Sequence, residues 1–157
     1  MGFVESWLAM EIGRLLGNWV MPRGLGIVSG ADGMMRLFPG TVRMPDVGFI
    51  SAGRLPGGRI PTAPIAPFAP DLAIEVLSES NTKREMERKR EEYFKAGTRL
   101  VWEIDPRSRT AAVYRSVTDR TVQNQQLDAG EILPGFTLSL TDLFASLDAR
   151  YGPPNVS

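Results

Sequence analysis

Two acidic residues lie inside apolar segments of the chain, where they could bind a metal. Glu75 lies within DLAIEVLS at residues 71–78, and Asp46 lies within MPDVGFI at residues 44–50. An unpaired buried charge costs several kcal/mol, so each acid needs a basic partner, a metal or exposure to water. Two strands that each present one carboxylate are a reasonable frame for a divalent cation. The alternatives are a buried salt bridge or exposed strand end for Glu75 and a turn aspartate for Asp46.

A lysine downstream of these acids is the third candidate for chemistry. The chain has only three lysines, Lys83, Lys89 and Lys95, and all of them fall on one predicted helix. At 100° per residue, Lys89 lies on the apolar side of that helix, next to the direction of Tyr93. Lysine is a compact charge with an adjustable pKa, which arginine is not. The alternative is a surface pair with Glu85, worth about 0.2–0.5 kcal/mol.

The composition excludes several kinds of site. The chain contains no cysteine and no histidine, so thiolate chemistry, histidine general bases and the usual nitrogen ligands of zinc, copper or iron are excluded. Any metal would be bound by oxygen atoms, which favours magnesium, manganese or calcium. Lys and Arg number 18, as do Asp and Glu, so a DNA-binding surface would have to be a local patch.

Periodicity and turn signals predict the elements that position these residues. Apolar spacing predicts a helix over 4–19, and a capping box at Thr82–Glu85 followed by Gly97 predicts another to about residue 96. Apolar runs predict strands at 26–38 (two, around a turn), at 41–51 with a kink or an edge at Pro45, and at 71–78. They also predict a hairpin of strands 99–105 and 110–116 and a weak strand near 121–127. Thr141 is predicted to cap a short C-terminal helix. The predicted fold class is α/β, a mixed β-sheet with helices on both faces, in one domain over 1–157.

The candidate residues form a combined pattern along the chain. MPDVGFI is followed by a Pro-rich loop at 53–70, APDLAIEVLSESN, a helix with Lys89-x-x-x-Tyr93 and Ala96-Gly97, and LVWEIDP. This pattern resembles the putative restriction endonuclease family within the PD-(D/E)XK nuclease superfamily, over about residues 2–145. The resemblance implies a restriction-endonuclease-like fold and metal-dependent endonuclease activity on DNA phosphodiester bonds, with Mg²⁺ (or Mn²⁺) as cofactor.

The resemblance also implies roles for particular residues. Asp46 takes the place of the aspartate of the PD element, and Glu75 that of the acid of the (D/E)XK element, which makes both metal ligands. The third position of that element is Leu77, and Lys89 occupies the place from which this family supplies the missing charge. The implied catalytic set is therefore Asp46, Glu75 and Lys89. The candidates for supporting residues are Asp71, Glu85 and Tyr93.

The chain starts inside the first helix of the family pattern. We therefore expect 1–157 to be a single nuclease-like domain that lacks the usual N-terminal strand segment and its acid. Glu5 and Glu11 lie on that helix, but helical spacing directs neither of them convincingly toward the site. Two other hypotheses remain open: an inactive relative that binds DNA or a protein, and an unrelated α/β phosphoesterase acting on small nucleotides.

The sequence also predicts a location and partners. No run of eighteen apolar residues is present, so we expect no membrane span. The N-terminus lacks a basic region ahead of an apolar stretch, which excludes a signal peptide and favours the cytoplasm. DNA is the expected partner. A homodimer is expected because the superfamily commonly pairs two active sites and because the predicted hairpins offer exposed strand edges.

Overall fold

A computed structural model describes residues 2–151, and its centre is one mixed β-sheet. Six strands lie in the order β1-β4-β5-β6-β7-β8. Their bounds are β1 Gly26–Ser29, β4 Val47–Ser51, β5 Leu72–Val76, β6 Leu100–Asp105, β7 Thr110–Tyr114 and β8 Arg120–Gln123. Strands β5 and β6 are parallel, and the other neighbouring pairs are antiparallel. The parallel pair is joined by helix α2, Lys83–Lys95, as the predicted crossover requires.

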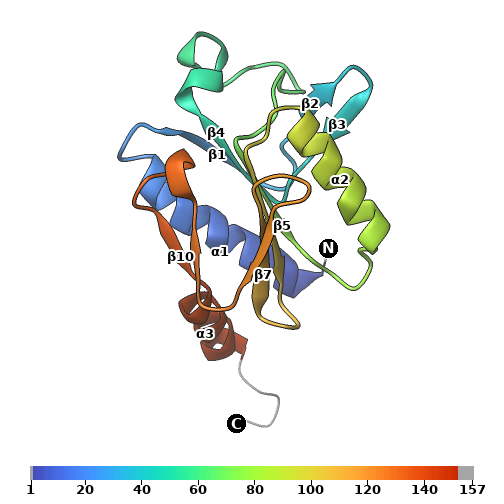
Figure 1. Ribbon diagram of the computed structural model, residues 1–157. Helices are drawn as coiled ribbons and strands as arrows, with labels where there is room; N and C mark the ends of the chain where they lie inside the picture. The colour runs from blue at the N-terminus through green and yellow to red at the C-terminus, as the bar shows by residue number, and fades with distance from the viewer. Residues whose placement is uncertain (1, 152–157) are drawn as a thin grey trace.

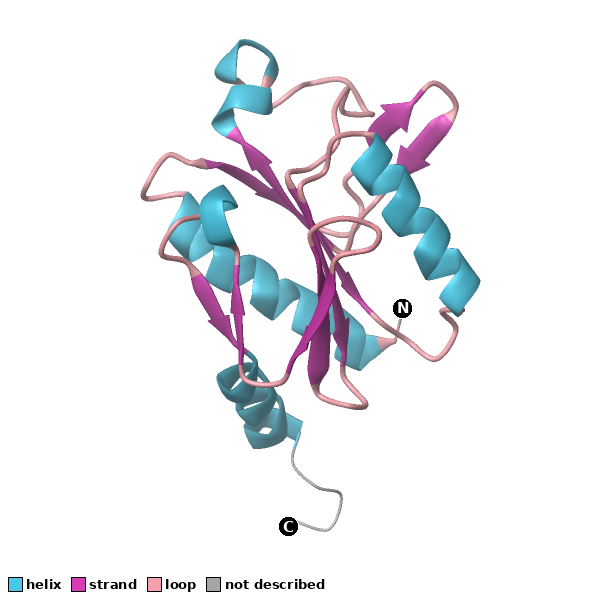
Figure 2. Ribbon diagram, viewed as in Figure 1, coloured by secondary structure: helices cyan, strands magenta, loops and turns pink. Residues whose placement is uncertain are grey.

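The remaining elements cover the two faces of the sheet (Figures 1 and 2). Helix α1, Phe3–Val20, packs on one face together with β9, β10 and α3, which are Gln126–Asp128, Thr137–Ser139 and Leu140–Tyr151. Helix α2 covers the other face beside a small hairpin of β2, Met35–Phe38, and β3, Thr41–Arg43. Short helical turns lie at Ala52–Arg54, Pro56–Gly58 and Gly130–Ile132. The predicted mixed sheet with helices on both faces is confirmed.

Strand β5 is buried on both sides, which decides the direction of each of its side chains. Leu72, Ile74 and Val76 belong to the main core with α1. Ala73 belongs to a second cluster that contains Tyr93 of α2. Because side chains alternate along a strand, Glu75 shares the face of Ala73, which α2 covers.

Helix α2 begins and ends where the sequence predicts, whereas α3 does not. The Thr82 hydroxyl accepts a hydrogen bond from the Glu85 N–H at 3.1 Å, and Gly97 has φ 103° beyond the last turn. Thr141 was predicted to cap the C-terminal helix, which is wrong. That helix already includes Thr141, and the Ser139 hydroxyl accepts from the Asp142 N–H at 3.0 Å.

Strand pairing differs from the sequence prediction in three places. The single strand predicted at 41–51 is interrupted at residues 44–46, because Pro45 has no N–H to donate, and its two halves belong to different sheets. Strands β1 and β2 both form but pair with β4 and β3 rather than with each other. The weak strand near 121–127 is two strands, β8 and β9, and β9 pairs with the unpredicted β10.

Gly26 at the start of β1 is expected to be the most sensitive glycine of the sheet. It has φ +152°, and an added Cβ would lie 2.0 Å from the carbonyl oxygen of Ile50. We expect Gly26→Ala to lower the free energy of unfolding by roughly 2 kcal/mol or more, measured by urea denaturation. Gly17→Ala is the matched control, since nothing lies within 4 Å of its Cβ position in α1. Helix propensity predicts a gain of about 0.5–1 kcal/mol there. Equal effects at both positions would contradict this account.

Candidate active site

Three acidic residues occupy neighbouring positions across adjacent strands, on the face of the sheet that α2 covers. The pairing of β4 with β5 ends at Val47 opposite Ile74, and the same register continued by one residue puts Asp46 opposite Glu75. In the parallel pair, Glu75 lies opposite Glu103. Opposed residues of neighbouring strands project to the same face. The sheet therefore brings together Asp46 and Glu75, which are 29 positions apart in the sequence, and adds a third acid.

Asp46 is oriented by the strand that carries Glu75. Its Oδ2 atom accepts a hydrogen bond of 2.7 Å from the backbone N–H of Val76. Burial raises the pKa of Asp46, while this N–H and the charge of Lys89 act in the opposite direction. The interruption of the predicted 41–51 strand is thus what lets an aspartate side chain bond the end of β5.

Glu75 is 5% exposed and is bonded to α2. The Tyr93 hydroxyl donates to Glu75 Oε1 at 2.9 Å. Burial, followed by the charge of Asp46, raises the pKa of Glu75 to about 7, against the opposing effects of Lys89 and Tyr93. Burial and the neighbouring Glu75 also raise the pKa of Tyr93 well above its usual value, so the phenol remains a hydrogen-bond donor. Tyr93 was predicted as a supporting residue, and it contacts Glu75 directly.

Lys89 lies at the border between this acidic row and solvent. Its Nζ atom is 3.8 Å from Glu85 Oε1, and its side chain is 22% exposed. Burial raises the pKa values of Asp46, Glu75 and Glu103, and the positive charge of Lys89 opposes each of these rises. Both sequence interpretations therefore describe the same residue: Lys89 pairs with Glu85 on the helix surface and also acts electrostatically on the buried acids. Glu85, a predicted supporting residue, is therefore a partner of Lys89.

Glu103 and Arg90 form an ion pair that the sequence analysis missed. Arg90 Nη1 donates to Glu103 Oε2 at 2.6 Å; Glu103 is buried and Arg90 is half-buried. The Arg90 guanidinium also lies 4.3 Å from the ring centre of Tyr114. Burial raises the pKa of Glu103, and Arg90 opposes the rise. A signal was present in the sequence, because Glu103 interrupts the apolar run LVWEID as Glu75 interrupts DLAIEV.

Asp71 lies at the opposite end of β5 from the acidic row. Arg54 Nε is 2.9 Å from its Oδ1 atom, and the Ser51 N–H donates to its Oδ2 atom at 2.7 Å. These contacts join the start of β5 to the turn that follows β4. Asp71, a predicted supporting residue, is therefore not brought to Asp46 and Glu75 by the fold.

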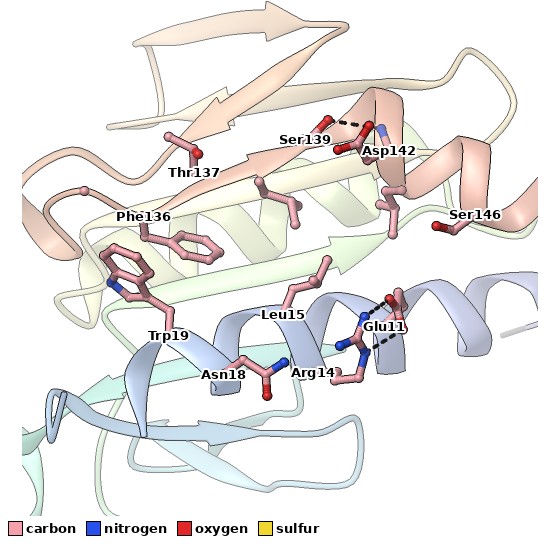
Figure 3. A pocket seen from close by; sticks show the side chains of 13 residues that line it. Glu11, Arg14, Leu15, Asn18, Trp19, Phe136, Thr137, Ser139, Asp142 and Ser146 are labelled. Atoms are coloured by element: carbon pink, nitrogen blue, oxygen red, sulfur yellow. Dashed lines mark hydrogen bonds and ion pairs between the residues drawn. The ribbon is translucent and has the colours of Figure 1, made fainter. Parts of the chain in front are cut away.

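Two cavities open beside the acidic row, and a third lies away from it. A groove of about 500 Å³ between α1 and the β1–β4 edge has Asp46 in its wall. A groove of about 770 Å³ at the start of α2 is lined by Arg90 and Glu103, with Lys83, Arg107 and Arg120 nearby. The third, of about 510 Å³, lies between α1 and β10–α3, where Trp19 faces Phe136 (Figure 3). That cavity contains none of the predicted site residues.

Comparison with known proteins identifies the family. The family model Uma2, described as "Putative restriction endonuclease", matches residues 1–141. The chain belongs to the Uma2 family. A crystal structure described as a putative nuclease belonging to DUF820, from Anabaena variabilis, is similar to this Uma2 chain with a TM-score of 0.82 and 25% identity. The match covers 94% of this chain and 83% of that one, and no curated protein matches. The resemblance stated from the motifs and the fold class are both confirmed.

The oxygen atoms of this site fit a magnesium or manganese ion. Asp46 Oδ2 and Glu75 Oε1 are each engaged by one donor, and within residues 2–151 no hydrogen bond occupies the second oxygen of either carboxylate. Across the same residues, no three acidic side chains gather in a cluster that could hold a metal. Magnesium is commonly bound by only one or two carboxylates, with water and substrate phosphate completing its shell. Asp46 and Glu75 are thus the residues that would hold such an ion.

Proposed function

We propose that this Uma2 protein is a Mg²⁺- or Mn²⁺-dependent endonuclease that hydrolyses DNA phosphodiester bonds. The observation that supports the proposal is the opposed pair of Asp46 and Glu75, each with one oxygen left for a ligand, within the electrostatic reach of Lys89. When bound, the ion would supply Lewis-acid chemistry, polarising the scissile phosphate and promoting ionisation of water.

The residues of the chain then have distinct tasks. Asp46 and Glu75 hold the ion, and their orientation is set by the Val76 N–H and the Tyr93 hydroxyl. Lys89 positions the attacking water or stabilises the negative charge that develops on the phosphate. The chain needs no histidine or cysteine for this chemistry.

The test is nicking of supercoiled plasmid DNA by the purified full chain. We expect relaxed and linear products with Mg²⁺ or Mn²⁺ and none with excess EDTA. Isothermal titration with Mn²⁺ should show binding that Asp46→Asn weakens. Nicking that persists undiminished in EDTA would overturn the proposal.

Substitution of Lys89 separates its role from that of the metal ligands. Lys89→Met keeps an unbranched apolar stem and removes the charge, so we expect the nicking rate to fall roughly a hundredfold. Mn²⁺ affinity should remain comparable, because the lysine is not a ligand. Lys83→Met is the matched control, because it removes a positive charge from the same helix but outside the acidic row. We expect this variant to nick DNA at nearly the wild-type rate. A similar loss in both variants would refute the assignment of Lys89.

An inactive relative that binds DNA is the second candidate function. It is favoured by the ion pair of Glu103 with Arg90, which leaves Asp46 and Glu75 as the two acids of the acidic row available to a metal. DNA binding that is independent of metal, together with absence of nicking, would support this candidate. A homodimer and a cytoplasmic location stay predictions. Within residues 2–151, no helix is long and apolar enough to span a membrane.

A further inference from the structure

The chain leaves the main sheet after β1, forms the β2–β3 hairpin beside α2 and re-enters the main sheet at β4, just after Asp46 (Figure 1). The end of the hairpin at which Met35 pairs with Arg43 is also tied to the Pro-rich loop. There the Ala66 N–H donates to the Met34 carbonyl and the Arg36 N–H donates to the Ala66 carbonyl, both at 2.9 Å. Leu37 of β2 and Phe94 of α2 pack against the same cluster around Tyr93. The hairpin is therefore part of the α2 layer, although the chain returns from it directly into β4.

An ion pair joins the returning end of this hairpin to α2. Arg43 Nε lies 2.5 Å from Glu92 Oε2, and the two side chains are 28% and 17% exposed. Lys95 reinforces the contact, with its Nζ 5.2 Å from the ring centre of Phe38. Other hairpin contacts are apolar or lie farther from Asp46 along the chain, so the Arg43 pair is the polar link nearest to that residue.

The position of this pair in the sequence links two parts of the site. Arg43 precedes Asp46 by three residues, and the intervening Met44 and Pro45 make no strand pairing. Glu92 directly precedes Tyr93, whose hydroxyl bonds Glu75. A short connection therefore runs from each end of the ion pair to one of the two candidate metal ligands.

We propose that Arg43 is a positioning residue of the candidate site, which holds the residue 44–46 turn against α2 through Glu92 and so keeps Asp46 opposite Glu75. This inference rests on the proposed function, because metal binding is the reason why Asp46 and Glu75 need to lie opposite each other. It assigns Arg43 no contact with substrate.

Removal of Arg43 should leave the fold intact, which makes the inference testable. Glu92 would keep a second partner, since Arg88 Nε lies 3.4 Å from its Oε1 atom. The β2–β3 hairpin would keep its apolar contacts and its bonds to Ala66. The expected change is local, at the turn that carries Asp46.

The experiment measures the hydrogen bond that Asp46 accepts, independently of activity. In the full chain, NMR hydrogen–deuterium exchange of the Val76 amide is compared among wild type, Arg43→Gln, Glu92→Gln and the double variant Arg43→Glu/Glu92→Arg. We expect exchange to be about tenfold faster in both single variants and within about threefold of wild type in the double variant. Arg109→Gln, which removes the remote pair with Asp148, is the control and should change nothing at Val76.

Metal binding provides the second measurement. Mn²⁺ affinity should fall roughly tenfold in Arg43→Gln, as is usual when a residue that orients a ligand is lost, and should recover in the double variant. Saturating Mn²⁺ should restore most of the nicking rate of Arg43→Gln.

The outcomes separate this inference from the proposed function. Unchanged Val76 exchange in Arg43→Gln would overturn the inference. A second result would also overturn it: Val76 exchange that is as fast in the double variant as in Arg43→Gln, but at the wild-type rate in an Arg43→Lys variant. In that case residue 43 would act only through its positive charge and not through its pair with Glu92. If the wild-type protein neither binds Mn²⁺ nor nicks DNA, the proposed function fails, and Val76 exchange still decides whether Arg43 positions Asp46.

Discussion

Glu75→Gln is expected to lower metal-dependent nicking of DNA by about a thousandfold or more. The substitution keeps the size of the side chain and an oxygen that can accept from Tyr93, but removes the charge that would bind the cation. A metal ion contributes several kcal/mol of transition-state stabilisation, and each 1.36 kcal/mol corresponds to a factor of about ten in rate. The measurement is the single-turnover nicking rate with Mg²⁺ and with Mn²⁺, together with Mn²⁺ affinity by calorimetry.

A buried acid in the same row provides the matched control. Glu103→Gln also removes one negative charge from the α2 face, and its amide oxygen can still accept from Arg90. Because Glu103 is already bonded to Arg90, we expect this variant to retain most of the Mn²⁺ affinity. Circular dichroism and thermal melting would verify that both variants are folded. Nicking by Glu75→Gln at the rate of Glu103→Gln would reject Glu75 as a metal ligand.

Without metal, the stability of the protein is expected to fall as the pH rises from about 4.5 to about 7. The pKa of Glu75 is about 7 in the folded chain and 4.5 for an unperturbed glutamate, so the folded state keeps this proton over a range in which the unfolded state has lost it. The contribution of Glu75 is therefore fully present below pH 4.5 and lost once the pH exceeds about 7. At 1.36 kcal/mol per pH unit, the loss is about 3 kcal/mol.

Urea denaturation in EDTA at a series of pH values would measure this effect. The control is Glu75→Gln, which has no proton to release at this position, so the difference between the two curves isolates Glu75. We expect the variant to be the more stable protein at pH 8 and the two proteins to converge near pH 4.5. Mg²⁺ should return part of the lost stability to the wild type alone, because the cation binds the ionised carboxylate. If the free energies of unfolding of the wild type and Glu75→Gln changed in parallel with pH, ionisation of the buried Glu75 would not lower the stability of the protein.

The segment from β5 to α2 could be predicted from the sequence because its signals are local. The apolar run around Glu75, the cap at Thr82 and the glycine at position 97 each depend on near neighbours in the chain, and all three are confirmed by the structure. Helical periodicity likewise placed Lys89 at the border of the buried face. The absence of cysteine and histidine was enough to restrict any metal site to oxygen ligands.

Strand register and long-range partners were decided only by the tertiary structure. Which residue lies opposite Glu75 depends on the pairing of β4, β5 and β6, and a shift of one residue would turn each side chain to the other face. The sequence predicted a kink or an edge at Pro45, but not that residues 41–43 would lie in a separate hairpin beside α2 and only residues 47–51 in the main sheet. The pairs of Arg90 with Glu103 and Arg43 with Glu92 likewise join residues on different elements. The sequence alone thus determined the candidate metal ligands, and the fold decided how they are oriented and which residues hold them in place.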